Sequence, residues 1–97
     1  SEIYEQLGMT VSELTPELAE RFNYAADGGV IVTELEPQGL AAQSGLRPGT
    51  LITSVNLQTV TSMDEFMEAL AASEESGRVV LRIRQGRFHR YVAFRIR

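Results

Sequence analysis

The sequence predicts a small α+β domain with more strands than helices, in which a strongly bent sheet or partly open barrel of five or six strands is capped by two or three helices. Short runs rich in β-branched residues recur along the chain and are separated by Gly, Pro and Asn turns. Other stretches have apolar residues at helical spacing and begin with residues that cap helix N-termini. Because 97 residues, 43% of them hydrophobic, are enough for one core, we expect a single domain over residues 1–97.

The expected strands show either two-residue alternation or a continuous apolar run. The first covers residues 9–11, and the second, residues 30–35, is apolar almost throughout, as in a strand covered on both faces. The others span residues 51–56, 59–60, 79–84 and 88–96, and the last two form a hairpin across Gln85-Gly86-Arg87. One face of this hairpin should carry arginines, while the other sends into the core Val79, Leu81, Ile83, Phe88, Val92, Phe94 and Ile96.

The expected helices differ in length. The helix over residues 16–22 has Thr15 as its N-cap and Pro16 at its first helical position. A very short helix should lie within residues 39–46 and end at a glycine, Gly45, in a left-handed conformation. The longest helix begins after Thr61 or Ser62 and ends before Gly77. Its apolar side is wide enough to contact two neighbours and consists of Met63, Phe66, Met67, Leu70 and Ala71.

Charge narrows the classes of partner. The net charge is −4, but all 13 acids lie at or before Glu75, whereas the residues from Arg78 onward carry only arginines as charged groups. We interpret this split as two solvated faces of one fold. A basic platform is the alternative, made of Arg82, Arg84, Arg87, Arg90, Arg95 and Arg97 with Tyr91. No nucleic-acid-binding motif accompanies it, so we expect no nucleic-acid partner.

Other classes of function find little support. No apolar run approaches the ~18 residues of a membrane span, so we expect no direct membrane insertion. The chain has no cysteine, and its one histidine, His89, lies beside arginines without a nucleophile motif. Carboxylate pairs such as Glu34 and Glu36 fall at positions that we expect to be exposed. We therefore expect no catalytic residues, no metal site and no cofactor in this chain, and Ser1 in place of Met suggests a piece of a longer protein.

A specific family resemblance appears at residues 39–56. Their sequence, GLAAQSGLRPGTLITSVN, is similar without a gap to the segment S-P-A-A-x-A-G-L-x-P-G-D-x-I-x-x-V-N of PDZ domains of the HtrA serine-protease type. The stretch Gln6-Leu7-Gly8-Met9 resembles the G-L-G-F carboxylate-binding loop of that family. Residues 63–70 resemble the helix that forms the other wall of its groove. The order of elements is similar to the permuted order of bacterial PDZ domains, which begin with the groove strand and end with the paired strands.

The resemblance implies a peptide-binding site. An extended segment of a partner would add as an extra strand to the groove strand, Met9, Thr10 and Val11. Its terminal carboxylate would lie on the backbone N–H groups of Leu7, Gly8 and Met9. The implied partners are peptide or unfolded-protein segments with apolar C-terminal residues.

The resemblance also implies which side chains contact the ligand. The last side chain would enter an apolar pocket lined by Leu7, Met9 and Val11 on one side and by Met67 and Leu70 on the other. The residue two positions upstream would face Met63, which has no hydrogen bond to offer to Ser or Thr, so an apolar residue is expected there. Methionines are flexible and polarizable, which suits a groove that accepts several sequences.

The resemblance further implies a parent protein, an HtrA-like serine endopeptidase of the periplasm or cell envelope with a role in protein quality control. Its catalytic domain or a second PDZ domain would be a partner of this module, and the parent would form oligomers. Glu5 and Gln6 occupy the place where many PDZ domains hold a cation, which leaves open whether ligands end in a free carboxylate or are internal or misfolded segments. An alternative function is an assembly or docking module with an inert groove, which mediates oligomerisation through the basic C-terminal hairpin.

Overall fold

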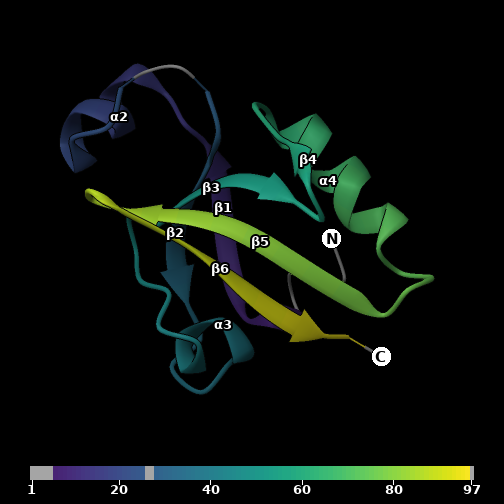
Figure 1. Ribbon diagram of the computed structural model, residues 1–97. Helices are drawn as coiled ribbons and strands as arrows, with labels where there is room; N and C mark the ends of the chain where they lie inside the picture. The colour runs from purple at the N-terminus through teal and green to yellow at the C-terminus, as the bar shows by residue number, and fades with distance from the viewer. Residues whose placement is uncertain (1–5, 26–27, 97) are drawn as a thin grey trace.

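The computed structural model describes residues 6–25 and 28–96, and its elements follow the expected order (Figure 1). Within these residues the elements are β1 (Met9–Glu13), α2 (Pro16–Phe22), β2 (Val30–Leu35), α3 (Leu40–Gln43), β3 (Leu51–Val55), β4 (Gln58–Thr59), α4 (Met63–Ala72), β5 (Arg78–Gln85) and β6 (Phe88–Arg95). The expected fold class, a small open sheet capped by helices, is confirmed.

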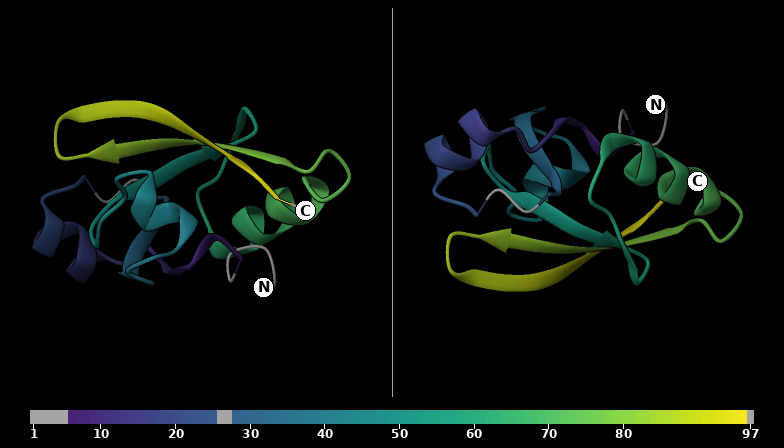
Figure 2. Two further views of the ribbon diagram at one scale, coloured as in Figure 1. Left: turned by 90° about the horizontal axis from the view of Figure 1, so that it is seen from below. Right: turned by 90° about the horizontal axis from the view of Figure 1, so that it is seen from above.

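All neighbouring strands of the sheet are antiparallel. Their order is β1-β2-β3-β5-β6, and β4 pairs with β3 beside this path. Strands β1 and β6 therefore form the two edges. Figure 2 shows the β5–β6 hairpin along one side of the molecule, with α2 and α3 toward one end and α4 toward the other.

Two apolar clusters hold the sheet and helices together. The larger lies between the sheet and α4, where Phe66 is fully buried together with residues from β2, β3, β5 and β6. The smaller cluster lies under α2 and contains Ala19, Tyr24, Ile31 and Leu51. Ile31 and Leu51 belong to this second cluster, while Val30, Val32 and Ile52 belong to the first. Both faces are therefore covered along the first half of β2, as its apolar run predicts, whereas Glu34 near its end is exposed.

The helix boundaries follow the capping residues. The Thr15 hydroxyl accepts a hydrogen bond from the Leu18 N–H at 3.2 Å, and Pro16 begins α2 as expected. Ser62, the second of the two expected candidates, caps α4 and accepts from the Glu65 N–H at 3.2 Å. Gly45 adopts the expected left-handed conformation after α3, with φ of 91°.

Two predictions about apolar contacts are wrong. Ala71, expected on the apolar side of α4, is exposed, and Ala69 is buried instead. Phe88 was expected to enter the core, but 76% of its surface is exposed. It begins β6 beside the hairpin turn and pairs with Gln85, at the end of the hairpin away from α4. Farther along β6, where the sheet is covered, Val92, Phe94 and Ile96 are buried as expected.

Several strand boundaries also differ from expectation. β1 continues past Val11 to Glu13, β5 is Arg78–Gln85 in place of residues 79–84, and β6 ends at Arg95 in place of residue 96. The expected strands over residues 51–56 and 59–60 are instead Leu51–Val55 and Gln58–Thr59. This last shift is caused by a two-residue turn at Asn56 and Leu57, both with positive φ, of 49° and 70°. None of the helices in residues 6–25 and 28–96 is long and apolar enough to span a membrane.

Candidate peptide-binding groove

The loop before β1 turns at Gly8, which has a φ of 77°. A Cβ atom at this position would lie 3.0 Å from Gly39 Cα, so a larger residue would require the backbone to move. The Gly8 carbonyl accepts a hydrogen bond from the Glu36 N–H at 2.8 Å. Leu7 is fully buried in the larger cluster. The loop is thus fixed both by the buried Leu7 side chain and by the segment after β2. The sequence places Glu5 where many PDZ domains hold a cation, but Glu5 lies outside the described residues.

Strand β1 is an edge of the sheet, and among the described strands it pairs only with β2. Met9 is buried, and Val11 packs against the same cluster, so these two side chains point toward the core. Thr10 and Ser12 alternate with them and point to the opposite, outward face of the sheet. Within residues 6–25 and 28–96, no strand pairs with the other edge of β1.

Helix α4 contributes the three methionine and leucine positions expected from the sequence. Leu70 is 1% exposed within the larger cluster, whereas Met63 and Met67 are partly buried and pack against it. Leu7, Met9, Val11 and these three residues therefore belong to one apolar assembly, which connects the loop, β1 and α4. Leu7 and Leu70 form its base and the two methionines its more accessible part.

Glu13 is a residue beside the candidate groove that the sequence reasoning missed. Its carboxylate accepts a hydrogen bond from the Met63 N–H, the first residue of α4, at 2.9 Å. A carboxylate at a helix N-terminus is favourable because the first N–H groups are unpaired and the helix dipole is positive there. Glu13 therefore links the end of β1 directly to the start of α4. Because residues two apart in a strand lie on one face, continuing the alternation of Met9 and Val11 to residue 13 would have placed Glu13 on the same face.

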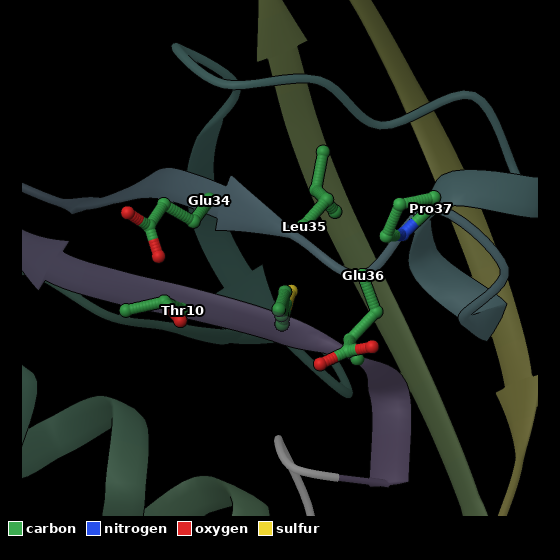
Figure 3. Close-up of a pocket in the computed structure, with 7 residues that line it drawn as sticks. Thr10, Glu34, Leu35, Glu36 and Pro37 are labelled. Atoms are coloured by element: carbon green, nitrogen blue, oxygen red, sulfur yellow. The ribbon is translucent and has the colours of Figure 1, made fainter.

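A hollow of about 430 Å³ lies beside β1 and β2 (Figure 3). It is lined by Gly8, Met9, Thr10, Glu34, Leu35, Glu36 and Pro37. Thr10 and Glu34 are directly opposite each other in the β1–β2 ladder, and both are exposed. Figure 3 shows the Glu34 carboxylate directed toward Thr10 and the Glu36 carboxylate over the beginning of β1. Both glutamates fall at exposed positions, as expected.

The N-terminus of α4 is stabilised a second time by Glu65. Its carboxylate accepts hydrogen bonds from the Thr61 N–H at 2.7 Å and from the Thr61 hydroxyl at 2.9 Å. The backbone hydrogen bond, followed by that from the hydroxyl, lowers the pKa of Glu65 from its ordinary value of 4.5. The Ser62 hydroxyl accepts from the Glu65 N–H, while the Glu65 carboxylate binds Thr61, the residue before the N-cap.

His89 lies on the outward face of β6, opposite Arg84, and is exposed. Within residues 6–25 and 28–96, no group of three or more His, Cys, Asp or Glu side chains is arranged to hold a metal ion. The candidate site thus consists of apolar side chains, a strand edge and backbone groups. Such an arrangement is suited to binding a ligand rather than to acid–base chemistry.

Comparison with known protein families identifies this arrangement. A family model described as a PDZ domain matches residues 31–85, which include all of β2 except its first residue and the whole of α3, β3, β4, α4 and β5. The chain belongs to the PDZ domain family. Residues 7–9 and strand β1 precede the matched segment, so their roles as groove loop and groove strand remain predictions from the G-L-G-F resemblance.

Curated relatives match most of the chain. A probable DegP-like periplasmic serine endoprotease of Chlamydia pneumoniae is 34% identical over 92 residues, which cover 94% of this chain and 19% of the relative. A DegP-like protein of the same description from Pseudomonas fluorescens is 41% identical over 83 residues, 84% of this chain and 17% of the relative. The chain therefore spans less than a fifth of these relatives' length.

Solved structures agree with this assignment. The HtrA-type protease AlgW, solved with a decapeptide, is 26% identical, with a TM-score of 0.77 over 92% of this chain and 27% of AlgW. The PDZ domain of HtrA3, solved with the phage-derived ligand FGRWV, is 22% identical, with a TM-score of 0.74 over 92% of this chain and 82% of that domain. The AlgW match confirms the resemblance of this PDZ domain to the HtrA type, and the HtrA3 match confirms the fold.

Proposed function

We propose that this PDZ domain binds extended peptide segments with apolar C-terminal residues by adding them as a strand to β1. The observation that carries this proposal is the open edge of β1 next to an apolar wall from α4 that contains Met63, Met67 and Leu70. Two HtrA-type AlgW structures, solved with a decapeptide and with a tripeptide, support it, since these matches are 26% and 25% identical to this chain.

The binding mode follows from strand addition. Backbone groups of Met9, Thr10 and Val11 exchange hydrogen bonds with the ligand backbone, which gives affinity for many sequences. The N–H groups of Leu7, Gly8 and Met9 receive the terminal carboxylate, and charge-assisted hydrogen bonds of this kind are stronger than neutral ones. The left-handed φ of Gly8 supports this role, because it turns the backbone at the point where the ligand would end.

Specificity arises from the apolar side of the groove. The last ligand side chain contacts Met67 and Leu70, and the side chain two positions upstream contacts Met63. Because Met67 is only partly buried and flexible, its movement opens space above the buried Leu7 and Leu70. Apolar side chains of several sizes therefore fit.

The proposal extends to the protein from which this domain comes. We infer that residues 1–97 form one PDZ domain of an HtrA-like serine endopeptidase of the periplasm or cell envelope, as the descriptions of the curated relatives suggest. The domain recruits substrates or regulates a catalytic domain encoded outside this chain. Such a role belongs to protein quality control, and oligomers of the parent would present several grooves together.

Peptide titration tests the binding mode. Fluorescence anisotropy should show saturable binding of a labelled peptide ending in Val and much weaker binding of the same peptide ending in Asp. Met67→Lys places a charge at the apolar wall and should weaken binding roughly tenfold or more, as expected when burial of one aliphatic side chain is lost. Ala72→Lys adds the same charge at an exposed position of α4 and should leave the affinity unchanged. Equal weakening by both substitutions would contradict a groove at Met67.

A peptide with an amidated C-terminus distinguishes ligands that bind through a free carboxylate from internal or misfolded segments. If the free carboxylate contributes charge-assisted hydrogen bonds at Leu7, Gly8 and Met9, amidation should lower the affinity. If internal or misfolded segments are the natural ligands, the amidated and free peptides should bind equally well. Both results keep the strand-addition site, and failure of every apolar peptide to bind would exclude it.

A second candidate function rests on the outward face of the β5–β6 hairpin. Arg78 lies directly opposite Arg95, and Arg82 lies opposite Tyr91, all of them exposed. Like charges directly opposite each other are unfavourable unless an anion approaches them. Docking of this face on an acidic neighbouring domain would make the module an assembly element. Oligomers of the full-length parent that depend on Arg82 but are indifferent to Met67→Lys would favour this candidate.

A further inference from the structure

The alternation of an added strand places ligand side chains on both faces of the sheet. In the proposed function, on which this inference rests, the last and third-from-last ligand side chains face α4. The penultimate side chain must then point to the outward face, the face on which Thr10 lies. Its surroundings differ from the apolar groove.

The outward face beside the beginning of β1 is acidic. Thr10 is paired directly with Glu34, and the hollow of about 430 Å³ that they line also contains Glu36 and has no basic residue in its lining. Thr10 is short and stands between the open edge of β1 and Glu34, so it leaves room for a longer side chain to pass over it (Figure 3). Adjacent strands lie about 4.8 Å apart, so a ligand strand would be roughly 10 Å from β2. This exceeds the about 7–8 Å of diagonal neighbours on adjacent strands, so only a long ligand side chain such as Arg or Lys, with Glu34 extended toward it, closes the separation.

The backbone fixes the position of Glu36 next to the loop. Its N–H donates to the Gly8 carbonyl at 2.8 Å, and its own carbonyl accepts from the Gly39 N–H at 3.0 Å. A Cβ atom placed on Gly8 would lie 3.3 Å from Glu36 Cβ, so the glutamate side chain starts in contact with the loop. A carboxylate held there lies close to the end of the proposed ligand.

We propose that Glu34 and Glu36 make this groove select segments whose penultimate residue is Arg or Lys. A basic side chain from the ligand extends over Thr10 into the hollow and pairs with the two carboxylates. An acidic residue at the same position meets two like charges and is rejected. The position of the selected side chain is defined by the open strand edge, and its length is defined by the hollow. The two carboxylates then define its charge.

The test uses four peptides that end in Val and differ only in the penultimate residue, which is Arg, Lys, Gln or Glu. Their affinities are measured by fluorescence anisotropy against the wild-type domain and against the double variant Glu34→Gln/Glu36→Gln. A double variant with the same change of charge at exposed positions elsewhere, Glu20→Gln/Glu74→Gln, is the matched control. Each measurement is repeated at high salt.

We expect the wild-type domain to bind the Arg peptide about threefold to tenfold more tightly than the Glu peptide, as is usual for exposed ion pairs. This preference should disappear in Glu34→Gln/Glu36→Gln, persist in Glu20→Gln/Glu74→Gln and shrink at high salt. Equal affinities for the four peptides in the wild type, or a preference that survives in Glu34→Gln/Glu36→Gln, would overturn the inference while leaving strand addition intact. Absence of binding by all four peptides would overturn the proposed function as well.

Discussion

At the scale of single residues, Gly8 shows how one position couples fold and site. Its left-handed φ of 77° and the 3.0 Å from a Cβ to Gly39 Cα both exclude a side chain. Gly86 has a similar φ of 63°, but a Cβ there would meet nothing within 4 Å. A substitution at Gly86 would therefore introduce backbone strain alone, whereas one at Gly8 would introduce backbone strain and a steric clash.

Gly8→Ala should lower stability by more than Gly86→Ala and should also weaken peptide binding. Both substitutions place a Cβ in the left-handed region, which costs about 1–2 kcal/mol, but only Gly8→Ala also forces the loop away from Gly39. Urea unfolding and peptide affinity measure the two effects. Equal losses of stability with unchanged affinity would show that the loop at Gly8 neither is tightly packed nor takes part in binding.

Leu57 is a residue whose strain is independent of the site. It has φ of 70° at the turn between β3 and β4, and 83% of its surface is exposed. Leu57→Gly should therefore stabilise the domain by about 0.5–1 kcal/mol, since relief of the left-handed strain exceeds the entropic cost of glycine.

The control for Leu57→Gly is Gln58→Gly, which introduces glycine at the next residue, in β4, where the native φ is not positive. This control should lower the urea midpoint, because glycine gains conformational freedom in the unfolded chain without relieving strain. A fall of the midpoint in both variants would refute strain at Leu57.

At the scale of elements, helix α4 is positioned by carboxylates at its N-terminus. Glu13 joins the end of β1 to the Met63 N–H, so Glu13→Gln should weaken the link across the upstream end of the groove by about 0.5–1 kcal/mol. Hydrogen exchange at the Met63 amide should accelerate. Glu68→Gln, at an exposed position on the same helix, should not change that exchange rate, and equal acceleration in both variants would argue against the link.

Glu65 makes the stability of α4 dependent on pH. Its pKa is lowered in the folded state below the ordinary 4.5, mainly by the Thr61 N–H. Such a group stabilises the fold above its unfolded-state pKa, and the stabilisation disappears as the pH falls through the folded-state pKa. The unfolding midpoints of wild type and Glu65→Gln should therefore differ by a constant amount near neutral pH and converge in acid below 4.5. A difference that is unchanged across the acid range would contradict this role.

The success of sequence reasoning for individual elements depended on whether the signal was local. The bounds of α2 and β2 were predicted to the residue, because Thr15-Pro16 and a bounded apolar run mark them within a few positions. Phe88 was misplaced because alternation gives the face of a strand but not how far the other layer covers it. Glu13 was missed because its partner, Met63, lies 50 positions away in the sequence.

At the scale of the whole molecule, the fold brings together the residues of the candidate site from two distant parts of the chain. The family resemblance allowed the pairing of residues 7–11 with residues 63–70 to be predicted, and the larger apolar cluster contains both. The acidic hollow was not predictable, since the pairing of Thr10 with Glu34 depends on a register that shifts between Thr10 and Val11. The charge split has a structural counterpart, as arginines line the outward face of the hairpin at one edge of the sheet and acids lie beside β1 at the other.

The most direct test of strand addition to β1 is an NMR titration of the domain with a peptide ending in Val, followed by backbone amide chemical shifts. We expect the shifts to concentrate at residues 7–11 and 63–70, with little change along β6. Shifts that appear along the arginine face of the β5–β6 hairpin, and are absent from both of those segments, would contradict strand addition at β1.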